Sequence, residues 1–182
     1  MKLFIGSSSY DEIPKEYKID CKTYIDRLFE DDNSLVFGAC DRGLMGVSYT
    51  SAKEHNRKIL AISPKFYIDD LNKLDGVEKK ITETVHERNE KLIENADAII
   101  FVPGGIGTVY EIFAAIETKR GGEFDKPIVI YNSCGFYDTL IEFLNKLHEE
   151  KFISSEVKKM YYVSNSAEDT LEYISKYATI DK

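Results

Sequence analysis

The sequence has little of several features that mark whole classes of protein. Its three cysteines, Cys21, Cys40 and Cys134, are far apart, form no CxxC pair and are odd in number. A secreted disulfide framework is therefore not expected, and the thiols are predicted to be reduced. No apolar run reaches the roughly 18 residues of a membrane-spanning helix. The first apolar stretch ends at Ile5, too early for a signal peptide. We expect a cytoplasmic protein that does not insert into membranes.

Positive charge is also in short supply. The chain has 24 Lys and Arg against 32 Asp and Glu, a formal net charge of −8 at pH 7. A surplus of acid is the wrong sign for binding a nucleic-acid backbone or an anionic membrane. A phosphorylated ligand would have to be held locally, by backbone N–H groups, helix termini and one or two arginines. We expect a small-molecule partner, with no nucleic acid and no membrane.

Linkers, internal repeats and low-complexity segments are missing too. Hydrophobic residues make up 43% of the chain and charged residues 31%, which is typical of globular proteins. The length of 182 residues fits one domain on the usual scale of roughly 100–200 residues. We therefore expect a single domain over residues 1–182.

What the chain does contain is a regular alternation of short apolar runs and longer amphipathic segments. The short runs have the length and the β-branched and aromatic content of buried strands. This alternation predicts an α/β fold in which helices cover both faces of a doubly wound parallel sheet. The expected strands are 2–5, 34–37, 58–62, 98–102, 127–131 and 160–163, and the expected helices are 13–30, 43–56, 78–95, 107–120, 135–149 and 166–177. The long connection 63–77 is a candidate lid or interface element.

Three of the predicted strands end in glycine-bearing turns, and ligands bind at the carboxyl ends of strands in such sheets. The turns are GSSS at 6–9, GACDRGLMG at 38–46 and PGGIGT at 103–108. The third leads straight into a helix, so its glycines and the helix N-terminus can form an anion cradle, although a plain tight turn is the alternative. Its spacing is neither GxGxxG nor a Walker loop, which disfavours a dinucleotide oxidoreductase and a nucleoside triphosphatase. The serines at 7–9 can donate hydrogen bonds to a phosphate or sugar.

Thr108 and Glu111 follow the third turn with the T-x-x-E spacing of a capping box. In that interpretation they only satisfy the first amides of the helix. The alternative is a functional carboxylate, because an acid in the first helical turn is kept ionised by the helix dipole. The apolar residues at 112–116 would leave Glu111 as an isolated charge at a buried edge.

Arg88 is predicted to lie on the apolar side of the preceding helix. It shares a helical stripe with Ile81, Val85 and Leu92. A guanidinium in that position must find an anion. It could snorkel to solvent or form a structural ion pair, or it could bind a phosphate or Glu111.

Motifs for metal binding and serine hydrolysis are missing. His55, His86 and His148 lie on different predicted helices without ligand spacing, so they are expected at the surface and no metal or cofactor is expected. No GxSxG elbow occurs, which disfavours a serine hydrolase.

The stretch PGGIGTVYE resembles the PGGxGTxxE signature of the Lonely Guy family, cytokinin-activating nucleoside 5′-monophosphate phosphoribohydrolases once often labelled lysine decarboxylases. The likeness covers nearly the whole chain, since GSSS, DRGLMG, HER, GFYDTLIEFL and EEKFIS occur in the family's order. The resemblance implies a Rossmann-like homodimer. It also implies hydrolysis of the N-glycosidic bond in a nucleotide of the AMP or N6-modified AMP class, releasing free base and ribose 5-phosphate.

The resemblance also implies roles for individual residues. Arg88 and Glu111 match the family's catalytic pair, and Gly105, Gly107 and Thr108 match its phosphate-binding turn. The expected substrate-binding set is Ser8, Gly43, Asn89, Gly104, Gly105, Ile106, Gly107 and Thr108.

The chain differs from the family pattern at three places. Asn89 stands where lysine is usual, residues 38–40 read Gly-Ala-Cys in place of three glycines, and Glu117 stands where threonine is frequent. These differences concern the preferred base more than the bond that is cleaved.

Glycosidic cleavage passes through a cation-like state on the ribose, which a nearby carboxylate stabilises. We therefore interpret Glu111 as the group that stabilises this cation and orients or deprotonates water, and Arg88 as the group that positions the nucleotide. Two other classes stay open. One is a nucleotide or cofactor carrier without turnover, like the related molybdenum-cofactor carriers, and the other is a nucleoside deoxyribosyltransferase.

Overall fold

One parallel sheet organises the molecule, which a computed structural model describes over residues 1–180, with side chains through Tyr177. The last two residues of the expected domain lie outside this range. The strands are β1 Lys2–Gly6, β2 Ser34–Phe37, β3 Ile59–Pro64, β4 Glu78–Thr82, β5 Ala98–Phe101, β6 Ile128–Tyr131 and β7 Tyr162–Ser164. They pair in parallel in the order β4-β3-β2-β1-β5-β6-β7. The predicted doubly wound parallel α/β fold is confirmed.

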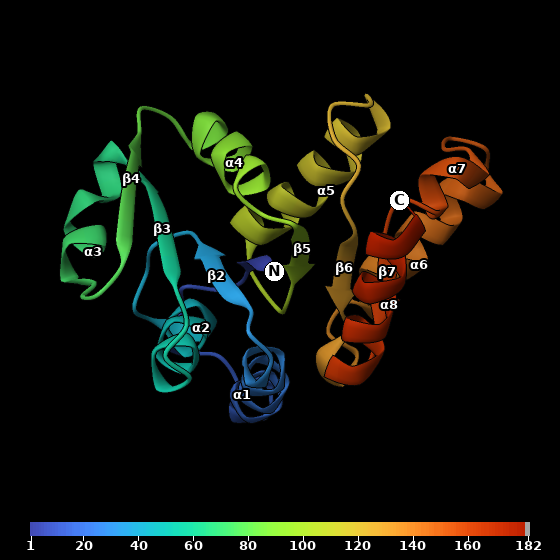
Figure 1. Ribbon diagram of the computed structural model, residues 1–182. Helices are drawn as coiled ribbons and strands as arrows, with labels where there is room; N and C mark the ends of the chain where they lie inside the picture. Colours follow the sequence, from blue (N-terminus) through green and yellow to red (C-terminus); the bar gives the residue numbers. More distant parts are fainter. Residues whose placement is uncertain (181–182) are drawn as a thin grey trace.

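Helices cover both faces of this sheet (Figure 1). They are α1 Lys15–Glu30, α2 Gly43–Glu54, α3 Ile68–Lys73, α4 Val85–Glu94, α5 Ile106–Arg120, α6 Asp138–Glu149, α7 Ser155–Lys158 and α8 Ala167–Ile180, with short 3₁₀ turns η1 Lys65–Tyr67 and η2 Ser133–Gly135. None of the helices within the described range is long and apolar enough to cross a membrane.

Two separate apolar cores form because successive side chains of a buried strand point to opposite faces of the sheet. In β1, Leu3 and Ile5 pack with α1, α2, α3 and α8, whereas Phe4 packs with α4, α5, α6 and α7. Figure 1 shows α1 and α2 on one side of the sheet and α4 and α5 on the other. Both faces of the central strands are therefore buried, which explains why they read as continuous apolar runs.

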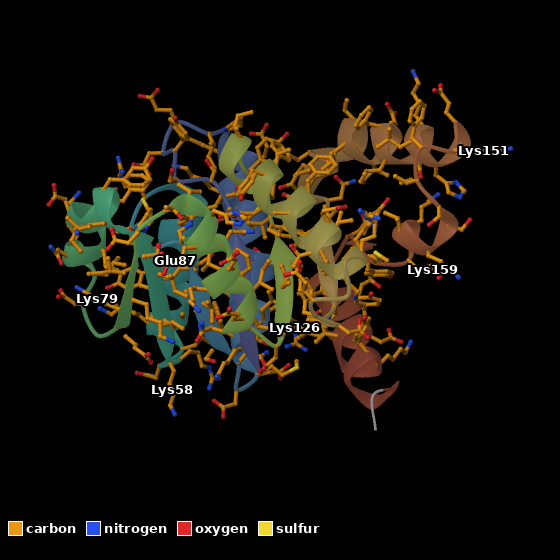
Figure 2. The ribbon with its side chains drawn as sticks, turned by 90° about the horizontal axis from the view of Figure 1, so that it is seen from above. Lys58, Lys79, Glu87, Lys126, Lys151 and Lys159 are labelled. Atoms are coloured by element: carbon orange, nitrogen blue, oxygen red, sulfur yellow. The ribbon has the colours of Figure 1, made fainter. Side chains whose placement is uncertain are left out.

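The expected helix at 78–95 is wrong in its first part, because residues 78–82 form the edge strand β4. This strand pairs only with β3, and its charged side chains face solvent, as edge strands commonly require. Figure 2 shows Lys79 of β4 at the margin of the molecule. Ile81, the apolar residue that suggested a helical stripe, is 56% exposed. The long connection at 63–77 also contains structure, since η1 and α3 lie within it.

The strand order reverses beside β1. From β1 the chain adds β2, β3 and β4 on one side, then crosses to add β5, β6 and β7 on the other. The strands β1 and β5 are paired to their carboxyl ends, but the segments that follow them lead to α1 and α5 on opposite faces of the sheet. Open α/β sheets bind ligands in the crevice between two such segments.

Candidate active site

A cavity of about 740 Å³ lies at the carboxyl ends of the central strands. All three glycine-bearing turns predicted from the sequence contribute to it. Its lining comprises Ser7, Ser8, Ser9, Tyr10, Gly38, Ala39, Cys40, Arg42, Met45, Tyr67, Asp70, Val85, Arg88, Gly105, Ile106, Gly107, Thr108 and Glu111. A cavity of this size is typical of small-molecule sites.

The third turn brings the start of α5 to the cavity. The helix begins at Ile106 with Gly105 as its N-cap, and no side chain caps it. The N–H groups of a first helical turn have no acceptor within the helix and carry the positive end of its dipole. Gly105 and Gly107 have no atoms within 4 Å of where a Cβ would lie, so their backbone is open to a ligand. These features are compatible with the anion cradle that the sequence suggested, which stays a prediction.

The capping-box interpretation of Thr108 and Glu111 is wrong. The helix starts earlier than predicted, so Thr108 lies inside the first turn and Glu111 lies in the second turn. Both side chains are buried. Gly104 allows this packing, because a Cβ there would overlap the Thr108 side chain. The Glu111 carboxylate is therefore not used to cap the helix and can interact with another group.

The partner of Glu111 is Arg88. Its Nη2 donates to Glu111 Oε1 in an ion pair whose side chains are only 10% and 3% exposed, respectively. The prediction that Arg88 is buried is confirmed, but not for the reason given, since Ile81 and Val85 of the supposed stripe are exposed. Arg88 is buried because it lies near the start of α4, which begins just after the carboxyl end of β4, and its side chain reaches the Glu111 carboxylate.

Glycines at two strand ends make room for the pair. A Cβ on Gly6, the last residue of β1, would lie 2.7 Å from the Phe101 ring and 3.0 Å from Glu111 Oε2. A Cβ on Gly38, just after β2, would lie 3.2 Å from Arg88 Nη1. The ion pair thus lies directly above the ends of β1 and β2, beside the glycine turn that follows β5.

Burial controls the electrostatics of the carboxylate. Desolvation raises the pKa of Glu111 from its usual 4.5 to about 7, against the opposing effect of the Arg88 charge. The sequence-based argument for the helix dipole placed Glu111 in the first helical turn; the residue lies in the second turn, where the dipole acts weakly, and its charged partner is Arg88. A carboxyl group that titrates near neutrality in a cavity is a candidate acid or base.

Several buried polar atoms around the pair have no protein partner. They are Arg88 Nε, Ser7 Oγ and Asn89 Oδ1. Buried polar atoms in proteins are nearly always hydrogen-bonded, and two of these unpaired atoms belong to Ser7 and Arg88, residues that line the cavity, so a polar ligand there is a candidate partner for them. Within the described residues, no cluster of His, Cys, Asp or Glu side chains could hold a metal ion.

Three of the predicted substrate-binding residues, Gly43, Asn89 and Gly104, lie outside the cavity lining. Gly43 has a positive φ of 59°, and a Cβ there would meet the backbone oxygens of Ser8 and Tyr10. It lets the start of α2 pack under the GSSS turn, where Met45 N donates to Ser8 O at 3.0 Å. The other five, Ser8, Gly105, Ile106, Gly107 and Thr108, line the cavity together with Arg88 and Glu111.

Sequence reasoning did not single out Arg42, Tyr67 and Asp70, which also line the cavity. Tyr67 and Asp70 come from η1 and α3, in the connection that was predicted only as a lid or interface element. Arg42 lies inside the second glycine motif, but nothing in the motif indicates an ion partner for it.

Known proteins that are similar to this chain fall into one family by sequence. The family described as possible lysine decarboxylase matches residues 45–174. The chain is 31% identical over 176 residues to the cytokinin riboside 5′-monophosphate phosphoribohydrolase LOG2 of Arabidopsis thaliana, spanning 96% of this chain and 82% of that protein. It is 28% identical over 153 residues to the probable cytokinin riboside 5′-monophosphate phosphoribohydrolase LOG4 of Oryza sativa subsp. japonica, spanning 84% and 66% of the two proteins.

Solved structures with a similar fold include carriers. The molybdenum cofactor binding protein of Rippkaea orientalis has a TM-score of 0.71 at 18% identity, covering 96% of this chain and 95% of that one. The molybdenum cofactor carrier protein of Chlamydomonas reinhardtii has a TM-score of 0.71 at 14% identity, covering 98% of each chain. At these identities the likeness concerns the fold alone.

Proposed function

The chain belongs to the Lonely Guy family, the group described as possible lysine decarboxylases, and from this premise we propose that it is a nucleoside 5′-monophosphate phosphoribohydrolase. Its reaction would hydrolyse the N-glycosidic bond of a nucleotide of the AMP or N6-modified AMP class to free base and ribose 5-phosphate. The observation that carries the proposal is the buried Arg88–Glu111 pair, which lines the same cavity as an uncapped helix N-terminus.

The first step of the proposed mechanism is capture of the 5′-phosphate. Backbone N–H groups at the start of α5, with Thr108 beside them, offer donors and a favourable dipole to an anion. The orphaned Ser7 hydroxyl offers a further donor. Binding energy from the phosphate, remote from the reacting bond, then holds the ribose in one orientation.

The second step is cleavage at C1′ of the ribose. As the C1′–N bond breaks, its electron pair leaves with the base and positive charge grows on the sugar. The Glu111 carboxylate stabilises that charge and takes a proton from the attacking water, whose oxygen bonds to C1′. Arg88 balances the charge of Glu111 and positions it, while the departing base gains one proton to complete the products.

We expect kcat/KM to rise with pH through an apparent pKa near 7. Only the ionised carboxylate stabilises a cation, and burial raises the pKa of Glu111 to about 7. Below this pH most of the free enzyme would hold a neutral Glu111 and be inactive. The measurement is base release from AMP at low substrate between pH 5 and 9. A flat profile across this range would contradict the assigned role of Glu111.

Product analysis separates the proposed hydrolase from its rivals. The protein is incubated with AMP, with and without a second free base, and the products are resolved by chromatography. Adenine with ribose 5-phosphate supports the hydrolase. A new nucleoside formed only with the acceptor base supports a deoxyribosyltransferase-like enzyme, and nucleotide binding without product supports a carrier.

We also propose that the protein is a homodimer, as expected from the family likeness. Exposed aromatic side chains on α5 and α6 support this, since Tyr110, Phe113 and Phe143 are 40%, 36% and 50% exposed. Light scattering should give about twice the chain mass of 20.8 kDa. A change of Phe143 to Asp should shift the mass toward the monomer, and a wild-type monomer at working concentration would contradict the proposal.

A further inference from the structure

The cavity extends well beyond the reaction centre. Its glycine turn follows β5, whereas Arg42 follows β2, and Tyr67 and Asp70 follow β3. These strands are adjacent in the order β3-β2-β1-β5. With neighbouring strands about 4.8 Å apart, the end of β3 lies roughly 14 Å from the end of β5. Figure 1 shows α3 beside β3 and β4, across the sheet from α5. A nucleotide with its phosphate on α5 therefore has space for its base toward α3.

Arg42 and Asp70 form an ion pair at this far end. Arg42 Nη2 donates to Asp70 Oδ2 at 3.0 Å, and Lys73 Nζ donates to Asp70 Oδ1 at 2.8 Å. The hydrogen bond from Lys73, with help from the Arg42 charge, lowers the pKa of Asp70, so this carboxylate is ionised at neutral pH. Its side chain is only 20% exposed, and that of Arg42 is 53% exposed.

The two charges that line this end of the cavity, on Arg42 and Asp70, are opposite, and the third charge of the cluster, on Lys73, belongs to a residue outside the lining. This end is therefore better suited to a neutral polar group than to a second phosphate. What the pair offers is a strong acceptor next to a strong donor. Such a combination matches the polar edge of a nucleobase, where amino groups donate and ring nitrogens accept. Carboxylates in particular accept hydrogen bonds from exocyclic amino groups of bases.

Tyr67 adds an aromatic surface beside this pair. Its ring lines the cavity, is half exposed and packs against Phe66 with ring centroids 4.6 Å apart. Exposed aromatic rings can stack on any nucleobase, because every base has a π-face. Tyr67 can thus stack on the face of a base while Arg42 and Asp70 form hydrogen bonds with its polar edge.

We propose that Asp70, Arg42 and Tyr67 recognise the nucleobase and select a purine with a free exocyclic amino group. The inference rests on the proposed function, whose substrate class it narrows to unmodified AMP. An oxo group at the same position would set acceptor against acceptor at Asp70. An alkyl chain on the amino group would remove a donor and desolvate the ion pair without replacing its hydrogen bonds.

The test compares AMP, IMP and N6-isopentenyl-AMP in two measurements. The first is kcat/KM from release of free base. The second is the dissociation constant in proteins that also carry Glu111→Gln, where the nucleotide is not consumed. The variants are Asp70→Asn, Tyr67→Ser and, as a matched control, Asp69→Asn, which changes an exposed neighbour in α3 outside the cavity.

We expect wild-type protein to favour AMP over the other two nucleotides by at least about tenfold, the size of one lost hydrogen bond to a charged group. Asp70→Asn should reduce that preference about tenfold, because an amide can donate to IMP as well as accept from AMP. Tyr67→Ser should weaken the binding of all three nucleotides by roughly tenfold and leave the ratios of their affinities unchanged. Asp69→Asn should behave as wild type.

An unchanged AMP-to-IMP ratio in Asp70→Asn, or a wild-type preference for N6-isopentenyl-AMP, would overturn the inference. Failure of the proposed function gives a different result. If no nucleotide is hydrolysed but AMP binds more tightly than IMP in an Asp70-dependent way, base recognition stands and the hydrolase proposal falls. Equal affinities for AMP and IMP overturn base recognition whether or not hydrolysis occurs.

Discussion

Replacement of Glu111 by Gln should lower kcat for AMP hydrolysis by at least about a hundredfold, the usual cost of removing one electrostatic contact from a transition state. Glutamine has nearly the same shape and can still accept a hydrogen bond from Arg88, but it carries no charge to stabilise the ribose cation and cannot take a proton from water. Phosphate contacts at α5 are unaffected, so KM should change little. Initial rates of adenine release at saturating AMP measure the effect.

The matched control for this variant is Glu117→Gln on the same helix. Only the family pattern linked Glu117 to base preference; in the structure it lies on the surface outside the cavity lining, where its side chain is 65% exposed and pairs with Arg120. Neither kcat nor stability should change by more than experimental error, because exposed ion pairs contribute little. If Glu111→Gln retained the turnover of Glu117→Gln while binding AMP normally, Glu111 would be only a structural partner of Arg88.

The second large effect is expected from Arg88→Met, which removes the guanidinium and keeps much of the side-chain volume. Activity should fall at least about a hundredfold at pH 7, since a group that positions and balances a catalytic carboxylate is lost. The acid limb of the kcat/KM profile should also move to higher pH. Arg88 opposes the effect of burial on Glu111, so the pKa of Glu111 rises further from about 7 when that positive charge is absent.

Stability against pH distinguishes this role from simple packing. A carboxyl group whose pKa is raised on folding binds protons more tightly in the folded state. The stabilisation that Glu111 contributes is therefore fully present at low pH and is lost as pH rises. In wild type the loss falls between pH 4.5, its usual pKa, and about pH 7, its pKa in the folded protein. In Arg88→Met the loss should continue above pH 7, where breaking a buried pair costs up to about 3–5 kcal/mol.

Melting curves at pH 6 and pH 8.5 measure this difference. The double variant Arg88→Met with Glu111→Gln removes both charges of the buried pair and should recover stability at pH 8.5. The control Arg120→Gln, on the surface, should melt as wild type at both pH values. An Arg88→Met protein equally destabilised at both pH values, and not rescued by the second change, would indicate loss of packing only.

Some of the proposed site residues could be predicted from the sequence and others could not. The glycine turns at strand ends could be predicted because glycine there has a local reason, namely the close approach of backbone or side chains. The pairing of Arg88 with Glu111 could only be suspected, since it depends on how α4 and α5 pack relative to each other on the sheet. The stripe that predicted burial of Arg88 was accidental, because Ile81 belongs to an edge strand.

The Arg42–Asp70 pair could not be predicted from the sequence either, because it too depends on tertiary packing. Asp70 lies on a six-residue helix in a connection without strong periodicity, and Arg42 lies 28 positions earlier in the chain. Short polar elements like this are fixed by tertiary packing, because their own helix propensity is too weak to define them. Local patterns therefore identified the glycine turn at the reaction centre but not the residues proposed to read the base.

The two residues of the ion pair lie on either side of a single strand, so one unbroken stretch of chain, α4-β5-α5, carries the proposed catalytic pair and the glycine turn beside it. The segment that holds Tyr67 and Asp70 is encoded elsewhere, between β3 and β4. Under the proposed assignments, we expect insertions, deletions or exchanges in that segment to change which nucleotide is accepted and to leave the proposed catalytic pair unaltered. Grafting this segment between relatives is a direct route to enzymes of altered substrate choice, and it mirrors how such choices can diversify during evolution.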